Sequence, residues 1–215
     1  MTFHIAKVKN WDFNMKMIKD IHLNYATDKG RGHSYVETHD RILKPYRDKE
    51  INFLEIGVLL GGSLKMWHEY FTKATIWGSD NFKQVNTNQD FGGINVNRDD
   101  VVKDLSTYER IKFIEPLDST DKLKVSETYN GTLFDVIIDD GDHNPTVQWE
   151  TFKNHIQFLS PDGIYIIEDV CGPGNATTLE KQIRDTYGNI GWNLEIETYT
   201  GNINERIDDI LLIIK

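Results

Sequence analysis

Acidic residues follow two mostly apolar runs of the sequence, and their types and spacing are suited to binding a cation. Residues 139–143 read Asp-Asp-Gly-Asp-His and follow the run 134–138, whereas Glu168 and Asp169 follow the run 163–167. Neighbouring strands of a parallel sheet end at the same edge, and ligands bind in the crevice outside that edge. Carboxylates gathered there repel one another and lose hydration, which a bound cation would offset. The two clusters therefore predict one cation site.

Three carboxylates and one imidazole of these clusters form the predicted reaction centre. Asp140, Glu168 and Asp169 offer the hard oxygen ligands that Mg²⁺ prefers, and open positions would remain for oxygen atoms of a substrate. A hydroxyl bound to a divalent ion loses its proton more easily. The neutral imidazole of His143, with an unperturbed pKa of about 6.5, can accept that proton. A helix cap is the alternative role for the other aspartates of residues 139–143, but it does not account for the second cluster.

A turn rich in glycine connects the first expected strand to a helix. It contains Glu55, Gly57, Gly61, Gly62 and Ser63. Glycines let the backbone approach a ligand, and the serine can cap a helix whose amino end faces that ligand. The spacing is neither that of a dinucleotide-binding turn nor that of a phosphate-binding loop, so a dinucleotide or nucleoside triphosphate is disfavoured. A purely structural role for the glycines remains the alternative.

Polar residues also follow the second and third expected strands. Asp80 follows the run 75–79 and stands 25 positions after Glu55 (80 − 55 = 25). Nucleotide-binding folds place a ribose-binding acid about 20 positions after their glycine turn, which is a similar spacing. Asp118 and Ser119 stand where an adenine ring would lie. A helix cap or a solvated turn is the alternative role for all three.

Strand and helix patterns alternate from residue 51 onward, which predicts an α/β fold with a single Rossmann-like, doubly wound, seven-stranded sheet. The expected strands are residues 52–56, 75–79, 111–115, 134–139, 164–168, 194–199 and 209–214, with helices at 63–71 and 146–159. Residues 200–205 are too few for a crossover helix, so the last strand should be antiparallel to the strand before it.

Residues 1–50 are expected to form a short N-terminal helical arm. One apolar face contains Phe13, Met17, Ile18 and Ile21, and a second contains Val36, His39, Ile42, Leu43 and Tyr46. Ser34 and Glu37 are predicted to form a capping box for the second helix. His39 is expected to pack inside, whereas His33 lies in a polar loop that could close over the site.

Composition restricts the partners of the chain. The formal net charge is −10 and the pI is about 5.1, which argues against nucleic acid and anionic membranes as partners and favours a small molecule. The single cysteine permits no internal disulfide, and the first residues lack the apolar segment of a signal peptide, so a cytoplasmic location is expected. The arm could also pack on a second copy of the chain, as in a homo-oligomer.

Together these motifs resemble the S-adenosylmethionine-dependent class I methyltransferases, and within them the metal-dependent macrolide sugar O-methyltransferases and the related cephalosporin hydroxylase-like proteins. The matching segments are Thr27-Asp28-Lys29-Gly30 with His33 and Tyr35, Glu55-Ile56-Gly57, Gly61-Gly62-Ser63-Leu64 with Met66-Trp67, Asp140-x-x-His143, and Ile167-Glu168-Asp169. The resemblance therefore extends over residues 27–169, most of the chain.

The resemblance implies S-adenosylmethionine and Mg²⁺ as cofactors, with residues 51–215 as the methyltransferase domain. It implies that the cation binds Asp140, Glu168 and Asp169 and that His143 is the base. By the same resemblance, the methionine part of the cofactor would lie at Glu55, Gly57, Gly61, Gly62 and Ser63, its ribose at Asp80, and its adenine at Asp118 and Ser119.

The leading hypothesis is a Mg²⁺-dependent O-methyltransferase that acts on a hydroxyl of a sugar or glycosylated small molecule. One alternative is a cephalosporin hydroxylase-like protein, although oxygenase iron sites usually contain two histidines and a carboxylate. Only His143 stands within the acidic clusters. The other alternative is a non-catalytic protein that binds S-adenosylmethionine.

Overall fold

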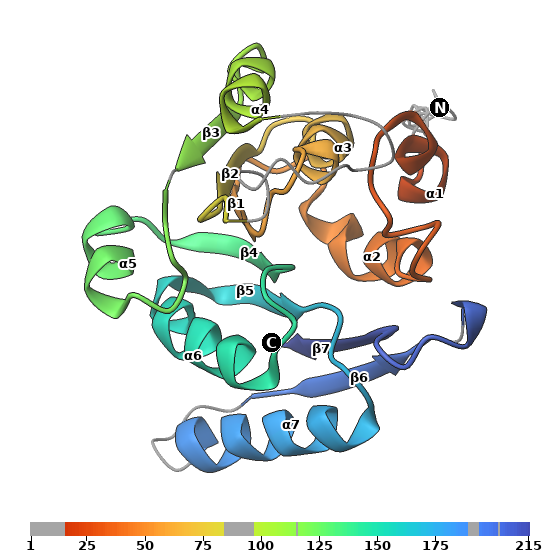
Figure 1. Ribbon diagram of the computed structural model, residues 1–215, viewed down its shortest axis with the longest axis vertical. Helices are drawn as coiled ribbons and strands as arrows, with labels where there is room; N and C mark the ends of the chain where they lie inside the picture. Colours follow the sequence, from red (N-terminus) through yellow and green to blue (C-terminus); the bar gives the residue numbers. More distant parts are fainter. Residues whose placement is uncertain (1–15, 84–96, 115, 189–193, 202) are drawn as a thin grey trace, which may run out of the picture.

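A computed structural model describes residues 16–83, 97–114, 116–188, 194–201 and 203–215 of the chain (Figure 1). The first part of the predicted arm, including Phe13, and residue 115 of the third expected strand lie outside these residues. Within them, no helix is both long enough and apolar enough to cross a membrane.

Seven strands form one sheet with the order β3-β2-β1-β4-β5-β7-β6. They are β1 (Asn52–Ile56), β2 (Thr75–Ser79), β3 (Ile111–Ile114), β4 (Phe134–Asp139), β5 (Leu159–Ile167), β6 (Ile196–Thr200) and β7 (Ile210–Ile214). The first five are parallel, and β7 is antiparallel to both β5 and β6. The predicted seven-stranded sheet with an antiparallel last strand is confirmed. Strand β5 begins earlier than expected, because Leu159 pairs with Phe134 ahead of a register shift.

The register of the central strands brings the predicted site residues to one edge. Asp139 of β4 pairs with Ile56 of β1 and with Ile167 of β5. The segments that follow these three strands therefore begin side by side. Strand order reverses between β1 and β4, and such a switch point is where doubly wound sheets bind their ligands.

Helices cover both faces of the sheet (Figure 1). They are α1 (Ile18–Ile21), α2 (Val36–Leu43), α3 (Gly62–Tyr70), α4 (Arg98–Leu105), α5 (Lys122–Thr128), α6 (Pro145–His155) and α7 (Pro173–Tyr187). Short 3₁₀ turns occupy His22–Asn24, Lys44–Tyr46, Ile156–Phe158 and Ile203–Glu205. Side chains of α1 to α4 pack on one face of the sheet, and those of α5 to α7 pack on the other.

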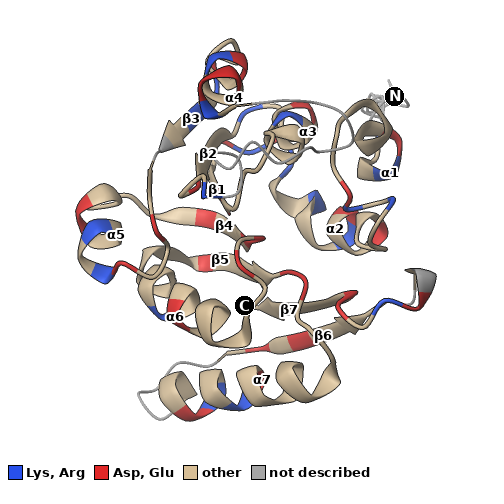
Figure 2. Ribbon diagram, viewed as in Figure 1, with Lys and Arg blue, Asp and Glu red and all other residues tan. Residues whose placement is uncertain are grey.

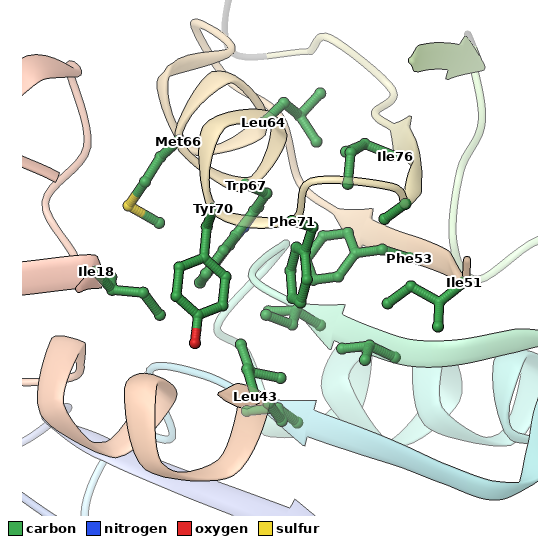
Figure 3. Close-up of a cluster of buried hydrophobic side chains, with 14 of the residues drawn as sticks. Ile18, Leu43, Ile51, Phe53, Leu64, Met66, Trp67, Tyr70, Phe71 and Ile76 are labelled. Carbon is green, nitrogen blue, oxygen red and sulfur yellow. The ribbon is translucent and has the colours of Figure 1, made fainter. Parts of the chain in front are cut away.

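The core explains why central strands such as β4 and β7 are mostly apolar. Val136 and Ile138 of β4 face the α3 side, whereas Ile137 between them faces the opposite side. Alternate side chains of a strand point to opposite faces, so a strand buried on both faces has no polar alternation. Figure 3 shows the α3 side of this core, where Trp67 and Phe71 lie against Phe53.

The described part of the arm packs on α3. Ile18, Ile21 and Leu43 are buried in the same cluster as the α3 side chains. The predicted capping box is wrong, because α2 has no side-chain cap at its amino end. Ser34 instead binds Asp209 just before β7, donating from its hydroxyl to Oδ2 (2.6 Å) and from its backbone N–H to Oδ1 (2.9 Å). A tertiary contact has replaced the local cap and fixes the arm to the end of the sheet.

Candidate functional site

A cavity of about 690 Å³ opens at the carboxyl ends of the central strands. Acidic residues gather in the segments that follow β4 and β5 (Figure 2), and Asp140, Asp142 and Asp169 of these segments line the cavity. Six of the predicted cofactor residues line it: Gly57, Gly62, Ser63, Asp80, Asp118 and Ser119. Glu55 and Gly61 are not among the lining residues, and the side chain of Glu55 is fully buried beneath the turn.

The glycine turn lies between the end of β4 and the arm. Gly57 has φ +92°, and a Cβ there would overlap the backbone of Asp140. A Cβ at Gly62 would overlap the backbone of Ala26 in the arm. Both glycines are therefore required for close packing of the chain around the cavity. The expected cap by Ser63 is absent: its hydroxyl donates to Glu55 Oε2 at 2.7 Å instead.

Asp80 holds the glycine turn in shape. Its Oδ2 accepts hydrogen bonds from the backbone N–H groups of Val58 (2.8 Å) and Leu59 (3.0 Å), and its Oδ1 accepts one from Phe82 (2.6 Å). A carboxylate has about four acceptor positions, so room remains for a further donor from the cavity. The structure thus adds a scaffolding role that the sequence did not indicate.

Asp140, His143 and Asp169 come together at one end of the cavity and form its acidic group. Each offers one ligand atom, and these atoms all lie within 4.8 Å of one another. His143 Nε2 is 3.7 Å from Asp140 Oδ1 and 3.5 Å from Asp169 Oδ2. Asp169 has φ +54°, a left-handed conformation that aspartate tolerates better than most residues. This turn of the backbone directs its carboxylate toward the other two side chains.

Glu168 lies apart from this group, behind the cavity. Its Oε2 accepts a hydrogen bond from Lys29 Nζ at 2.5 Å, and its Oε1 is 2.9 Å from Nε2 of His39. It does not line the cavity, and its side chain is 1% exposed. Glu168 continues the alternation of β5 and faces the α2 side, as Ile166 does. The structure therefore groups two of the three predicted metal ligands with His143 and separates the third from them.

No protein-family model matches the chain, but similar proteins are known by sequence. The L-olivosyl-oleandolide 3-O-methyltransferase of Streptomyces antibioticus is 32% identical over 68% of this chain and 35% of its own length. The 8-demethyl-8-alpha-L-rhamnosyl tetracenomycin-C 2'-O-methyltransferase of Streptomyces olivaceus is 27% identical over 69% of this chain and 36% of its own. The chain thus spans about a third of the length of these curated relatives.

A solved structure shares the architecture. The MycE methyltransferase from the mycinamycin biosynthetic pathway, in complex with Mg and SAH, matches with a TM-score of 0.68 at 22% identity, over 94% of this chain and 55% of that one. The chain has the class I methyltransferase fold. In sequence it resembles the sugar O-methyltransferases named above.

Within this methyltransferase fold, burial and charge set the protonation of the acidic group. Burial and the neighbouring Asp140 raise the pKa of Asp169 to about 7. Burial also raises the pKa of Asp139 to about 8. Burial would raise the pKa of Asp140 as well, but Lys29 and His143 outweigh it and lower that pKa to about 2. A hydrogen bond to Asp140 is the main reason that the pKa of His143 rises to about 9.

Lys29 and Tyr35 are site residues to which the sequence analysis gave no role, and Lys29 has the most contacts with carboxylates. Its ammonium group lies 2.6 Å from Asp140 Oδ2, 2.5 Å from Glu168 Oε2 and 3.4 Å from Glu55 Oε1, and its side chain is 1% exposed. Burial alone would lower the pKa of Lys29, but the three carboxylates raise it well above its usual value. The only signal in the sequence was its place in the segment Thr27-Asp28-Lys29-Gly30.

The two histidines of the arm that the sequence analysis names, His33 and His39, are both buried beside the site. His33 is 1% exposed, with Nδ1 3.2 Å from Asp169 Oδ1, so the polar loop does reach the acidic group. His39 is packed inside as expected, and burial lowers its pKa to about 3. It is therefore neutral at physiological pH.

Proposed function

We propose that this chain carries a Mg²⁺-dependent S-adenosylmethionine O-methyltransferase that acts on a hydroxyl of a sugar or glycosylated small molecule. The observation that carries the proposal is the convergence of Asp140, His143 and Asp169 at a cavity that the glycine turn also lines. The names of the sequence relatives, which are sugar O-methyltransferases, support the substrate class. The solved neighbour, described with Mg and SAH, supports the pair of cofactors.

The residues present fit a hard divalent cation. Asp140 Oδ1 and Asp169 Oδ2 both face the same small volume, and oxygen is the ligand atom that Mg²⁺ prefers. Bringing the two carboxylates together contributes to the raised pKa of Asp169, and a cation between them would relieve that repulsion. A bound Mg²⁺ would lower the pKa of a coordinated substrate hydroxyl.

Glu168 can bind the cation, as the sequence analysis predicts, only if its side chain moves. Both of its carboxylate oxygens lie against side chains of the arm, those of Lys29 and His39. The described geometry offers the two aspartates as direct ligands and His143 as either a third ligand or the base.

His143 is suited to receive the proton of the acceptor. Its side chain is 42% exposed, more than those of Asp140 (21%) and Asp169 (5%), so a substrate can reach it from the cavity. Hydrogen bonding to Asp140 favours the charged imidazolium, whereas a base must be neutral. Charge compensation of Asp140 and Asp169 would lower the pKa of His143 and free Nε2 to accept the proton.

The other end of the cavity would hold the methyl donor. S-adenosylmethionine would supply an electrophilic methyl group to the acceptor oxygen. The backbone at Gly57 and Gly62 would border its methionine part, Asp80 would accept hydrogen bonds from its ribose, and Asp118 with Ser119 would border its adenine. All five residues line the same cavity as His143.

A methyl-transfer screen tests this function. The protein is titrated with S-adenosylmethionine by calorimetry and then incubated with labelled cofactor, Mg²⁺ and a panel of nucleotide sugars and glycosides, with and without chelator. We expect transfer to at least one sugar hydroxyl, abolished by chelation. Full activity in excess chelator would contradict the metal mechanism. Tight cofactor binding without transfer to any acceptor would favour a binding protein instead.

Paired variants of the same loop sharpen the test. Asp140→Asn changes a carboxylate of the acidic group, whereas Asp142→Asn changes an exposed carboxylate whose Oδ1 accepts from the backbone N–H of Asn144. Both substitutions remove one negative charge, so a general effect of charge would appear in both. Asp142 also lines the cavity but is not one of the three clustered residues, so we expect loss of activity at position 140 and a much smaller effect at position 142.

A further inference from the structure

The two cavity-facing carboxylates are each held from behind by the same short segment of the arm. Lys29 Nζ donates to Oδ2 of Asp140 at 2.6 Å. The hydroxyl of Tyr35 donates to Oδ1 of Asp169 at 2.7 Å, and Nδ1 of His33 lies 3.2 Å from the same oxygen. Segment 29–35 therefore contacts one oxygen of each aspartate.

The remaining oxygen of each carboxylate points toward the cavity. Asp140 Oδ1 is 3.7 Å and Asp169 Oδ2 is 3.5 Å from Nε2 of His143. One oxygen of each aspartate is thus occupied by the arm, and the other is left for the reaction centre. This division occurs at both carboxylates although they follow different strands.

We propose that Lys29, His33 and Tyr35 form a ligand clamp, a set of positioning residues that aims the carboxylates of Asp140 and Asp169 before a divalent cation binds. The inference deepens the proposed function and rests on it. Outer partners of metal ligands fix ligand orientation, and their loss typically weakens metal binding or activity by about 10-fold to 100-fold.

The ligand clamp is itself rigidly held. All three of its side chains are at most 1% exposed. The ring of Tyr35 stacks on His33 at 4.8 Å between centroids, and its hydroxyl lies 2.9 Å from the carbonyl oxygen of Asp208. The backbone N–H of Tyr35 donates to the carbonyl of Lys29 at 3.0 Å. Because these contacts do not involve the cavity, the clamp can hold its geometry without ligand.

Tyr35→Phe is the most informative variant, because it removes the hydroxyl and keeps the stacked ring. We expect the affinity for Mn²⁺, followed by electron paramagnetic resonance on the cofactor-free protein, to fall by about 10-fold. Tyr25→Phe is the matched control, since Tyr25 also lies in the arm and donates to a carboxylate, Glu69 Oε2, at 2.8 Å outside the cavity. Its Mn²⁺ affinity should equal that of the wild-type protein.

Substitutions at Lys29 test the other half of the clamp. Lys29→Met should weaken Mn²⁺ binding at least as much as Tyr35→Phe, and Lys29→Arg should restore part of it because a cation remains beside Asp140. Binding of S-adenosylmethionine by folded variants should change less than Mn²⁺ binding, which a general loss of structure would not produce. If Lys29→Met does not fold, the comparison of Mn²⁺ affinity between Tyr35→Phe and Tyr25→Phe still tests the ligand clamp.

The outcomes separate the two proposals. No Mn²⁺ binding by the wild-type protein would overturn both the metal mechanism and the clamp. Wild-type binding with equal affinity in Tyr35→Phe and Tyr25→Phe would overturn the clamp alone and leave the metal mechanism standing. A selective loss in Tyr35→Phe supports the clamp.

Discussion

The Nζ atom of Lys29 lies 2.5 Å from Oε2 of Glu168, although 139 positions separate the two residues in the sequence. Both side chains are 1% exposed, so the pair is shielded from water. Removing one partner of such a buried pair leaves an uncompensated charge, which is far more costly than losing a surface ion pair. This contact makes the arm part of the site.

Burial raises the pKa of Glu168 to about 8 and that of Glu55 to about 7, although Lys29 opposes both shifts. Lys29→Met should lower the free energy of unfolding by about 3 kcal/mol at pH 8, because both buried carboxyl groups would lose their counter-charge and would have to take up a proton or stay charged without a partner. The double variant Lys29→Met/Glu168→Gln should recover part of that loss. Urea unfolding followed by circular dichroism measures both values. Lys65→Met, which breaks a more exposed pair with Asp104, is the control and should change stability by less than about 1 kcal/mol. The single variant Glu168→Gln, measured in the same way, completes the cycle, and strict additivity of the two single substitutions would show that the pair is not coupled.

His143→Ala distinguishes a base from a metal ligand. As the base, His143 can be removed with S-adenosylmethionine and Mn²⁺ binding intact while kcat falls by about 10²-fold to 10⁴-fold. As a ligand, its loss would weaken Mn²⁺ binding, as Asp140→Asn should. Calorimetry measures the affinity for the cofactor, and electron paramagnetic resonance measures the affinity for Mn²⁺. Single-turnover methyl transfer measures the chemical step. We expect kcat to fall while both affinities stay near wild type.

The metal-free protein should lose stability as the pH rises from 7 to 9. The pKa of His143 is raised to about 9 and that of Asp139 to about 8. The folded protein therefore holds protons that the unfolded chain has already released, and stability falls with pH wherever the folded state binds more protons. The stabilising effect of His143 is complete below its unfolded pKa of about 6.5 and lost through about 9. His39, with a pKa of about 3, is neutral throughout this range.

The melting temperature, measured between pH 7 and 9 in the presence of chelator, tests the predicted direction of this change in stability. Saturating Mg²⁺ should raise the melting temperature, and most at the alkaline end, because the cation replaces the protons on the acidic group. A melting temperature that rises from pH 7 to 9 in chelator would contradict the raised pKa values.

The edge of the sheet that carries the site could be predicted from the sequence, whereas the separate roles of the residues at that edge could not. Strands buried on both faces leave mostly apolar runs, so the bounds of residues 134–139 follow from the sequence pattern. Which of Glu168 and Asp169 faces the cavity depends on the φ of +54° at Asp169, and no pattern of residue types reveals that turn. Lys29 was missed for another reason: a lysine in a polar loop reads as solvated unless the fold brings three carboxylates around it.

Asp80→Ala should weaken the binding of S-adenosylmethionine through the shape of the glycine turn as well as through any direct contact. The carboxylate accepts backbone N–H bonds from Val58, Leu59 and Phe82, and a hydrogen bond to a charged group contributes about 1.5–3 kcal/mol. Loss of this order predicts an affinity for the cofactor about 10-fold to 100-fold weaker by calorimetry. Asp80→Asn keeps one acceptor oxygen, so its affinity for the cofactor should lie between those of the wild-type protein and Asp80→Ala. The affinity for Mn²⁺ should stay near wild type in both variants, because the acidic group receives no contact from Asp80. A parallel loss of Mn²⁺ affinity would mean that the turn and the acidic group form one cooperative unit.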